Sequence, residues 1–260
     1  MSVTRAKSDI RAKEYLQGAL AADEFLLHAQ KVVSLEQTAA ALGYELLPRV
    51  RLQGGRILTL SEFVSGGRVH LLLPSLDRWV VSHFAQMMQG RGQALSRLGL
   101  AISLTVTSQS AQDSDFAHFL SEEMRRTGVA QQVLVDIPEA AAVASINSGD
   151  HLLRSFCSSG CRLSIDGVGP DLKPLAALKH LPIGLVKIDG RLVRAVLTDS
   201  KAEAAVRSIV EFARKAGITT VAKCVETIAV AEHLRKLGVG FVQGYAFGHP
   251  EPFACVLASL

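Results

Sequence analysis

The chain has 260 residues, of which 48% are hydrophobic and only 5% aromatic, and its formal net charge is +4. This mild charge is not gathered into a basic stripe, which argues against a DNA-binding protein. The first residues are polar and the longest apolar runs fall far short of a membrane span, so we expect a cytoplasmic protein without a membrane-spanning helix. No linker-like segment divides the sequence, which predicts a loose leader at residues 1–9 and a single domain at residues 10–260.

Short apolar runs alternate with longer amphipathic segments along the chain. The runs have the length of buried strands, and the segments between them have apolar residues at helical spacing. Strands are predicted at residues 25–33, 44–52, 100–106, 132–137, 162–166, 185–189, 219–223 and 241–243. Helices are predicted at residues 77–89, 115–127, 139–157, 172–180, 201–215 and 228–237. Pro48 predicts an end or a bulge in the second strand, and residues 68–73 fit either a short strand or the approach to a helix.

Strands that alternate with helices at this spacing indicate parallel βαβ units. Eight such strands in one domain predict the α/β class and a (β/α)8 TIM-type barrel rather than an open doubly wound sheet. The sequence contains no G-x-G-x-x-G segment at its start, which argues further against a dinucleotide-binding fold.

Polar residues stand at the carboxyl ends of the predicted strands, where the active sites of such barrels lie. In chain order these residues are Glu45, Thr105, Asp136, Asp166, Lys187, Lys223 and Gln243. Converging carboxylates suggest hard cations such as Mg²⁺, and a pair of metal ions would suggest phosphodiester cleavage. Here the acids are few, however, and two lysines stand among them.

Six segments of the chain match one set of motifs. They are Glu45-Leu46-Leu47-Pro48-Arg49, Asp136-Ile137-Pro138-Glu139, Asp166-Gly167-Val168-Gly169, Lys187-Ile188-Asp189, Lys223-Cys224-Val225-Glu226-Thr227 and Gln243-Gly244-Tyr245. In that order they resemble the E-A-L-x-R, E-x-T-E, D-D-F-G, K-I-D, E-G-V-E-T and Q-G-Y motifs of the EAL-domain family, the phosphodiesterases of cyclic di-GMP. The resemblance covers nearly the whole chain and includes a first strand with Gln30. It implies an EAL-like barrel with the family's irregular first strand.

The departures from this family concern its metal ligands. The resemblance implies two metal ions held by the Glu of E-A-L, an Asn on the third strand, the first Glu of E-x-T-E and both acids of D-D-F-G. The first Glu of E-G-V-E-T serves the metal-bound water. This chain keeps Glu45 and Asp166. At the other four positions it carries Thr105, Asp136, Gly167 and Lys223.

Lys223 in place of a carboxylate changes the charge of the site by two units. An ammonium a few ångströms from a dication repels it by about 4 kcal/mol per unit charge pair at an effective dielectric constant near 20. We therefore expect no bound metal, no cofactor and no catalytic residues, and we interpret Glu45, Asp136, Asp166, Lys187 and Lys223 as vestigial positions. The amine of Lys223 either pairs with the remaining acids or, with Lys187 and Arg49, binds an anionic phosphodiester. In particular, Asp166 is predicted to lie near Lys223 or Lys187.

The resulting hypothesis is a degenerate, inactive EAL domain that acts as a cyclic di-GMP receptor, a regulator that binds a protein partner, or both. Its predicted ligand-binding residues are Gln30, Glu45, Arg49, Asp166, Lys187, Glu226 and Gln243. One alternative is a weak cyclic di-GMP phosphodiesterase that depends on Mg²⁺ or Mn²⁺. Another is a protein-interaction module that binds no nucleotide. Members of the family often dimerise, so a homodimer is one possible assembly of this chain. The altered loop Asp166-Gly167-Val168-Gly169-Pro170-Asp171 argues against the family's mode of dimerisation.

Overall fold

The computed structural model describes residues 24–36, 41–52, 54–60, 73–147, 151–158, 160–177 and 181–260, together with residues 18 and 62. The leader predicted at residues 1–9 and the ambiguous stretch at residues 68–72 lie outside the described residues.

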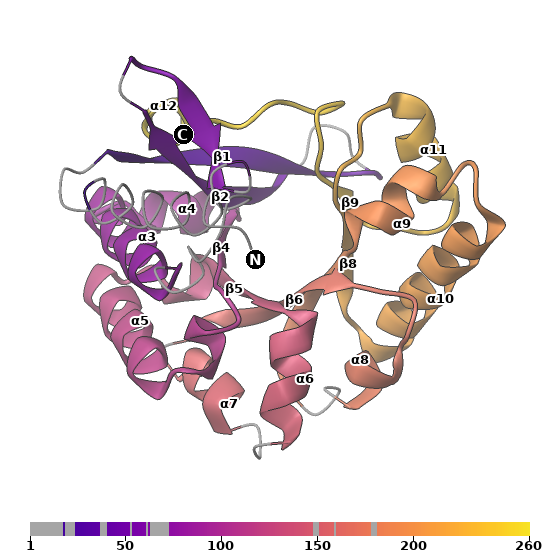
Figure 1. Ribbon diagram of the computed structural model, residues 1–260. Helices are drawn as coiled ribbons and strands as arrows, with labels where there is room; N and C mark the ends of the chain where they lie inside the picture. Colours follow the sequence, from indigo (N-terminus) through magenta and orange to yellow (C-terminus); the bar gives the residue numbers. More distant parts are fainter. Residues whose placement is uncertain are drawn as a thin grey trace, which may run out of the picture.

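A ring of strands forms the centre of the molecule (Figure 1). In ring order its members are β1 (Phe25–Ser34), β2 (Ala41–Arg51), β4 (Ala101–Thr105), β5 (Val133–Pro138), β6 (Arg162–Val168), β7 (Ile183–Ile188), β8 (Thr219–Ala222) and β9 (Phe241–Val242). Neighbours from β2 to β9 are parallel, and β1 closes the ring by pairing with both β9 and β2. The predicted TIM-type barrel is confirmed. The first strand is irregular, as the resemblance implies, because β1 is antiparallel to both neighbours.

Helices surround the barrel (Figure 1). They are α3 (Leu73–Met88), α4 (Gly92–Leu98), α5 (Ser114–Thr127), α6 (Glu139–Asn147), α7 (His151–Cys157), α8 (Lys173–Ala177), α9 (Gly190–Ala195), α10 (Ser200–Ala216), α11 (Ile228–Lys236) and α12 (Phe253–Ser259). Local chemistry explains where several begin and end. The carboxylates of Asp113 and Asp199 cap the starts of α5 and α10, and Gly128 and Gly217 end them in the left-handed conformation. Helices α4, α9 and α12 were not predicted from the sequence.

Two short strands extend the ring at β1 and β2. Strand β3 (Ile57–Thr59) pairs with the end of β2, and β10 (Glu251–Pro252) pairs with β1. The prediction of a strand end or bulge at Pro48 is wrong, because β2 runs through it and Pro48 faces Leu27 of β1. On the other side of β2, pairing with β4 stops at Leu46 and pairing with β3 starts at Arg49. Pro48 falls between the two ladders, where no partner needs its missing amide hydrogen.

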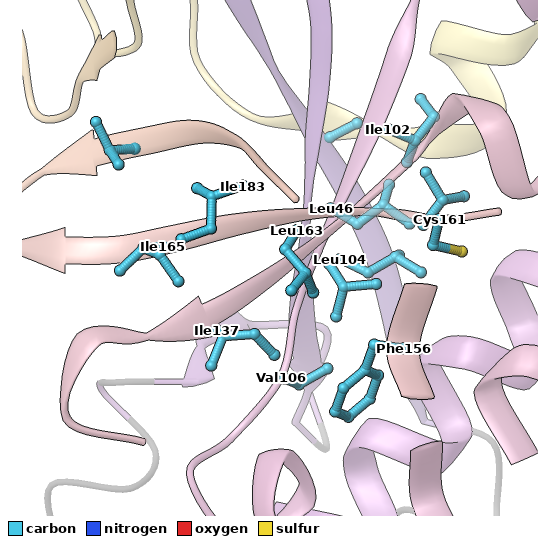
Figure 2. Close-up of a cluster of buried hydrophobic side chains, with 14 of the residues drawn as sticks. Leu46, Ile102, Leu104, Val106, Ile137, Phe156, Cys161, Leu163, Ile165 and Ile183 are labelled. Atoms are coloured by element: carbon cyan, nitrogen blue, oxygen red, sulfur yellow. The ribbon is translucent and has the colours of Figure 1, made fainter. Parts of the chain in front are cut away.

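Alternation along the strands divides the core into two parts. Residues that face outward pack against the helices in one large cluster, which Figure 2 shows around Ile102, Leu104, Leu163 and Ile165. Residues that face inward form a second, smaller apolar cluster inside the barrel, built on Val32, Ala101, Leu134, Leu185 and Val221. Because side chains two residues apart share a face, the inward positions after these apolar residues lie one layer nearer the mouth. Those positions carry the polar residues of the site.

Candidate functional site

A buried ion cluster lies in the barrel above the inner apolar layer. The ammonium of Lys187, at the end of β7, is 2.5 Å from Asp136 Oδ2 and 3.1 Å from Glu45 Oε2. The Lys187 side chain is 1% exposed, and both carboxylates are buried. Isolated charges at this depth would be unstable, so each ion depends on the others.

Hydroxyl groups complete the hydrogen bonding of these carboxylates. Thr105 Oγ1 donates to Glu45 Oε1 at 3.0 Å, and Ser103 Oγ donates to Asp136 Oδ1 at 3.3 Å. Thr105 Oγ1 is also 3.4 Å from Asp136 Oδ2. The two acids therefore share Lys187 and bind two hydroxyl groups.

A second ion pair joins the ends of β6 and β8, the two strands on either side of β7. Lys223 Nζ donates to Asp166 Oδ1, which confirms the prediction that Asp166 lies near one of the two lysines. Cys224 follows Lys223 with a φ of 59°, so the chain turns sharply directly after β8. The Lys223 and Asp166 side chains are 23% and 17% exposed, so this pair is closer to solvent than the Lys187 cluster.

The cluster sets the protonation of its own members. Burial would raise the pKa of Glu45, but the charges of Lys187 and Lys223 and a hydrogen bond from Gln243 lower it to about 2. Burial raises the pKa of Asp136, with the charges of Glu45 and Asp166 acting in the same direction. Burial would lower the pKa of Lys187, yet the surrounding carboxylates raise it. The surrounding carboxylates therefore favour the charged form of Lys187.

These residues do not fit a two-metal centre. Oxygens of Glu45, Asp136 and Asp166 are held by ammonium groups. Gly167 offers no carboxylate, and with a φ of 78° it forms a bulge between β6 and β7. Within the described part of the chain, no three His, Cys, Asp or Glu side chains are arranged to hold a metal ion. No reaction step through a metal ion is derived from this arrangement.

A cleft of about 660 Å³ opens above the cluster at the carboxyl ends of the strands. Of the predicted ligand-binding residues, the structure places Gln30, Glu45, Arg49, Glu226 and Gln243 in its lining. The other two, Asp166 and Lys187, are not in the lining and lie in the ion pairs described above. Of the vestigial positions, Glu45 and Lys223 contribute to the cleft, whereas Asp136 is buried beneath it.

The lining residues differ in how they are held. Gln30 donates through Nε2 to the backbone oxygen of Gly248 at 2.9 Å, which ties β1 to the C-terminal segment. Arg49 is half-buried and donates to Pro48 O at 3.1 Å, and its burial lowers the pKa of the guanidinium without discharging it. Glu226 is exposed. The cleft thus presents an amide, a cation and an acid from separate elements.

Sequence reasoning missed several residues that line this cleft, among them Asp77 and Arg194. Asp77, in the first turns of α3, accepts from Thr107 N at 2.8 Å and from Thr107 Oγ1 at 2.7 Å. Burial raises its pKa to about 6, although these hydrogen bonds act in the opposite direction. The signal for Asp77 was an acid on the apolar face of an amphipathic helix. Arg194 had no such signal, because it lies on the unpredicted helix α9.

Comparisons with known proteins agree on one family. The family model described as EAL domain matches residues 13–250. The chain is 28% identical over 237 residues to cyclic di-GMP phosphodiesterase PdeB of Shewanella oneidensis, which covers 91% of this chain and 28% of PdeB. It is 27% identical over 247 residues to cyclic di-GMP phosphodiesterase PdeF of Escherichia coli, which covers 95% of this chain and 32% of PdeF.

The fold is also similar to that of a solved structure, the FimX EAL domain from Pseudomonas aeruginosa bound to c-di-GMP. That likeness has a TM-score of 0.78 at 24% identity and covers 92% of this chain and 96% of the FimX domain.

The chain spans about a third of the length of PdeB and of PdeF. Among the helices that the structure describes, none is both long enough and apolar enough to cross a membrane.

Proposed function

Because the chain belongs to the EAL domain family, we propose that it acts in cyclic di-GMP signalling as a receptor that binds the nucleotide without hydrolysing it. The observation that carries the proposal is the pairing of Lys223 with Asp166 and of Lys187 with Asp136 and Glu45. Lys223, at a position where the family carries a carboxylate, supplies inside the protein positive charge that metal ions would otherwise bring. Hydrolysis of a phosphodiester at such a site lacks its activated water.

The cleft supports nucleotide binding by its size and chemistry. A volume of about 660 Å³ lies within the range of small-molecule sites, which is roughly 300–1,000 Å³. Arg49 can bind a phosphodiester through two parallel hydrogen bonds. The exposed carboxylate of Glu226 can accept from the N–H groups on the Watson–Crick edge of a guanine. Gln30 and Gln243 add amide groups to the same lining.

Calorimetric titration with cyclic di-GMP, in EDTA and in Mg²⁺ or Mn²⁺, tests this function. We expect binding of similar affinity in both buffers and intact nucleotide after overnight incubation, as measured by chromatography. Hydrolysis that appears on addition of metal would overturn the proposal in favour of the phosphodiesterase alternative. The absence of binding in both buffers would leave a protein-interaction module.

The phosphodiesterase alternative is supported by the names of the relatives and by the retained Glu45 and Asp166. It can be examined with the double substitution Lys223→Glu and Gly167→Asp, which restores two carboxylates. We expect metal-dependent hydrolysis only after restoration, and none in a Lys215→Glu control, which makes the same two-unit charge change as Lys223→Glu at a surface lysine paired with Glu211. Metal-dependent hydrolysis by the unaltered protein would favour the alternative directly.

A receptor that forms no product must pass its signal by contact, so we also propose a protein partner that distinguishes the free from the nucleotide-bound domain. We further propose that residues 10–260 fold as one degenerate EAL domain. Sedimentation of the protein with and without nucleotide tests whether the contact is a homodimer. A mass that stays monomeric in both conditions would rule out the homodimer and leave a different protein as the partner.

A further inference from the structure

Two arginines line the cleft without forming a direct ion pair among the described residues. Arg49 lies on β2, beyond the part of that strand that pairs with β4. Arg194 lies on α9, which follows β7. In the part of the chain that the structure describes, neither guanidinium forms an ion pair. The two lysines nearby are committed to carboxylates. The positive charge of the cleft that no carboxylate contacts directly is therefore carried by the two arginines, and Glu62 acts on Arg49 only from a distance.

The two arginines lie on opposite walls. In the ring of eight strands, β2 and β7 are four places apart, which is the largest separation that such a ring allows. The start of α9 is attached to the end of β7, because Asp189 caps the helix by accepting from Arg191 N at 2.7 Å. Arg49 and the beginning of α9 therefore face each other across the mouth of the barrel.

The guanidinium of Arg194 lies beside Gly190, at the start of α9. A Cβ atom at position 190 would lie 2.6 Å from Cys224 Sγ and 3.4 Å from Arg194 Nη1. The guanidinium therefore folds back over the first residue of its own helix, and α9 lies directly against Cys224, the residue after Lys223. This packing brings Arg194 to the cleft rather than to the outer surface, even though the residue as a whole is exposed.

We propose that Arg194 binds the second phosphodiester of a cyclic dinucleotide whose first phosphodiester is bound by Arg49. This inference rests on the proposed receptor function. A cyclic dinucleotide carries two phosphodiester groups on opposite edges of its ring, and each holds one negative charge at neutral pH. Two guanidinium groups on opposite walls complement that pattern. A mononucleotide has one phosphate and can engage only one wall, so the arrangement selects for the cyclic dinucleotide.

Binding of cyclic di-GMP and of GMP to the whole chain and to Arg194→Ala tests the proposal. We expect Arg194→Ala to weaken binding of cyclic di-GMP about 10- to 100-fold, as loss of a hydrogen bond to a charged group does. Binding of GMP should change by less than about twofold, because one arginine suffices for one phosphate. Arg194→Lys should lie between the two, since it keeps the charge and loses the fork of donors.

Arg191→Ala is the matched control. Arg191 lies one turn earlier on the same helix, is bound to Asp189 and does not line the cleft, so its loss should leave both affinities unchanged. If the unaltered protein binds cyclic di-GMP and Arg194→Ala binds it equally well, this inference fails while the receptor function stands. If the unaltered protein binds no cyclic di-GMP, both the receptor function and this inference fail. Equal weakening by Arg191→Ala would also overturn it, because it would show a general effect of charge.

Discussion

Positively charged side chains lie on the floor and on the walls of the cleft, but they have different roles in the two places. On the floor, Lys187 and Lys223 are each bound to carboxylates that come from other strands. On the walls, Arg49 and Arg194 form no direct ion pair among the described residues, although the charge of Glu62 acts on Arg49 from a distance. Burial makes the difference, because the Lys187 ammonium is 1% exposed and requires a counterion, whereas the half-buried Arg49 and the exposed Arg194 are reached by water.

This comparison separates stability from binding. Substitutions on the floor should change the free energy of unfolding, and substitutions on the walls should change affinity with little effect on folding. A single count of basic residues in the site would miss this division. The expected effect on the free energy of unfolding decreases from Lys187 on the floor, through Asp77 at the rim, to the pair of Lys223 and Asp166.

The largest effect is expected for Lys187→Met. It leaves Glu45 and Asp136 buried without their ammonium, and loss of one partner of a buried pair costs about 3–5 kcal/mol of unfolding free energy. Urea denaturation followed by circular dichroism measures it. Lys215→Met is the control, because its pair with Glu211 is exposed and worth about 0.5 kcal/mol or less. Similar small losses in both variants would contradict a structural role for the floor.

A second way to check this variant follows from the charges. Adding Asp136→Asn to Lys187→Met removes the carboxylate that Lys187 contacts at 2.5 Å, and it should restore part of the lost stability. If Lys187→Met alone does not fold, recovery of a folded protein by the double substitution makes the same point. A double variant that is still less stable than the single variant would mean that Asp136 does not need Lys187.

Asp77 at the rim should make stability depend on pH. Its pKa is raised from 3.8 to about 6 by burial, so folding favours the protonated form. The stability contributed by Asp77 is complete below the unfolded pKa near 4 and is lost as the pH rises through 6. A difference of about two pKa units corresponds to about 3 kcal/mol. Unfolding of the unaltered protein and of Asp77→Asn at pH 4, 5, 6 and 7 measures the difference.

In that comparison the unaltered protein should lose stability relative to Asp77→Asn as the pH rises from 4 to 7. Contributions from Glu45 and Asp136 cancel, because both proteins contain them. Parallel stability curves for the two proteins would show that Asp77 titrates with an ordinary pKa.

The smallest effect is expected for the pair of Lys223 and Asp166, whose side chains are 23% and 17% exposed. Its loss in Lys223→Met should cost about 1–2 kcal/mol, between a surface pair and a buried one. A double-mutant cycle with Asp166→Asn isolates the interaction. A coupling energy near zero would indicate that the two residues are held in place by their strands alone.

The fold followed from the sequence because its signals are local and repeated. Apolar runs of strand length between amphipathic helices predict a parallel barrel whatever the details of packing. The capping residues Asp113 and Gly128 similarly mark the ends of α5 by chemistry within a few residues. The direction of β1 was not predictable in this way, because an antiparallel and a parallel strand share the same alternation.

For the site, the sequence determined that acids and lysines meet at one end of the barrel, and it correctly predicted that Asp166 lies near one of the two lysines. Tertiary structure alone decided that Lys223 forms an ion pair with Asp166, while Lys187 pairs with Asp136 and Glu45. It also decided that Arg194 reaches the cleft, through the contact of Gly190 with Cys224. The physical reason is that periodicity specifies which end and which face of a strand a residue occupies, whereas partner choice depends on register, side-chain reach and burial between segments distant in the chain.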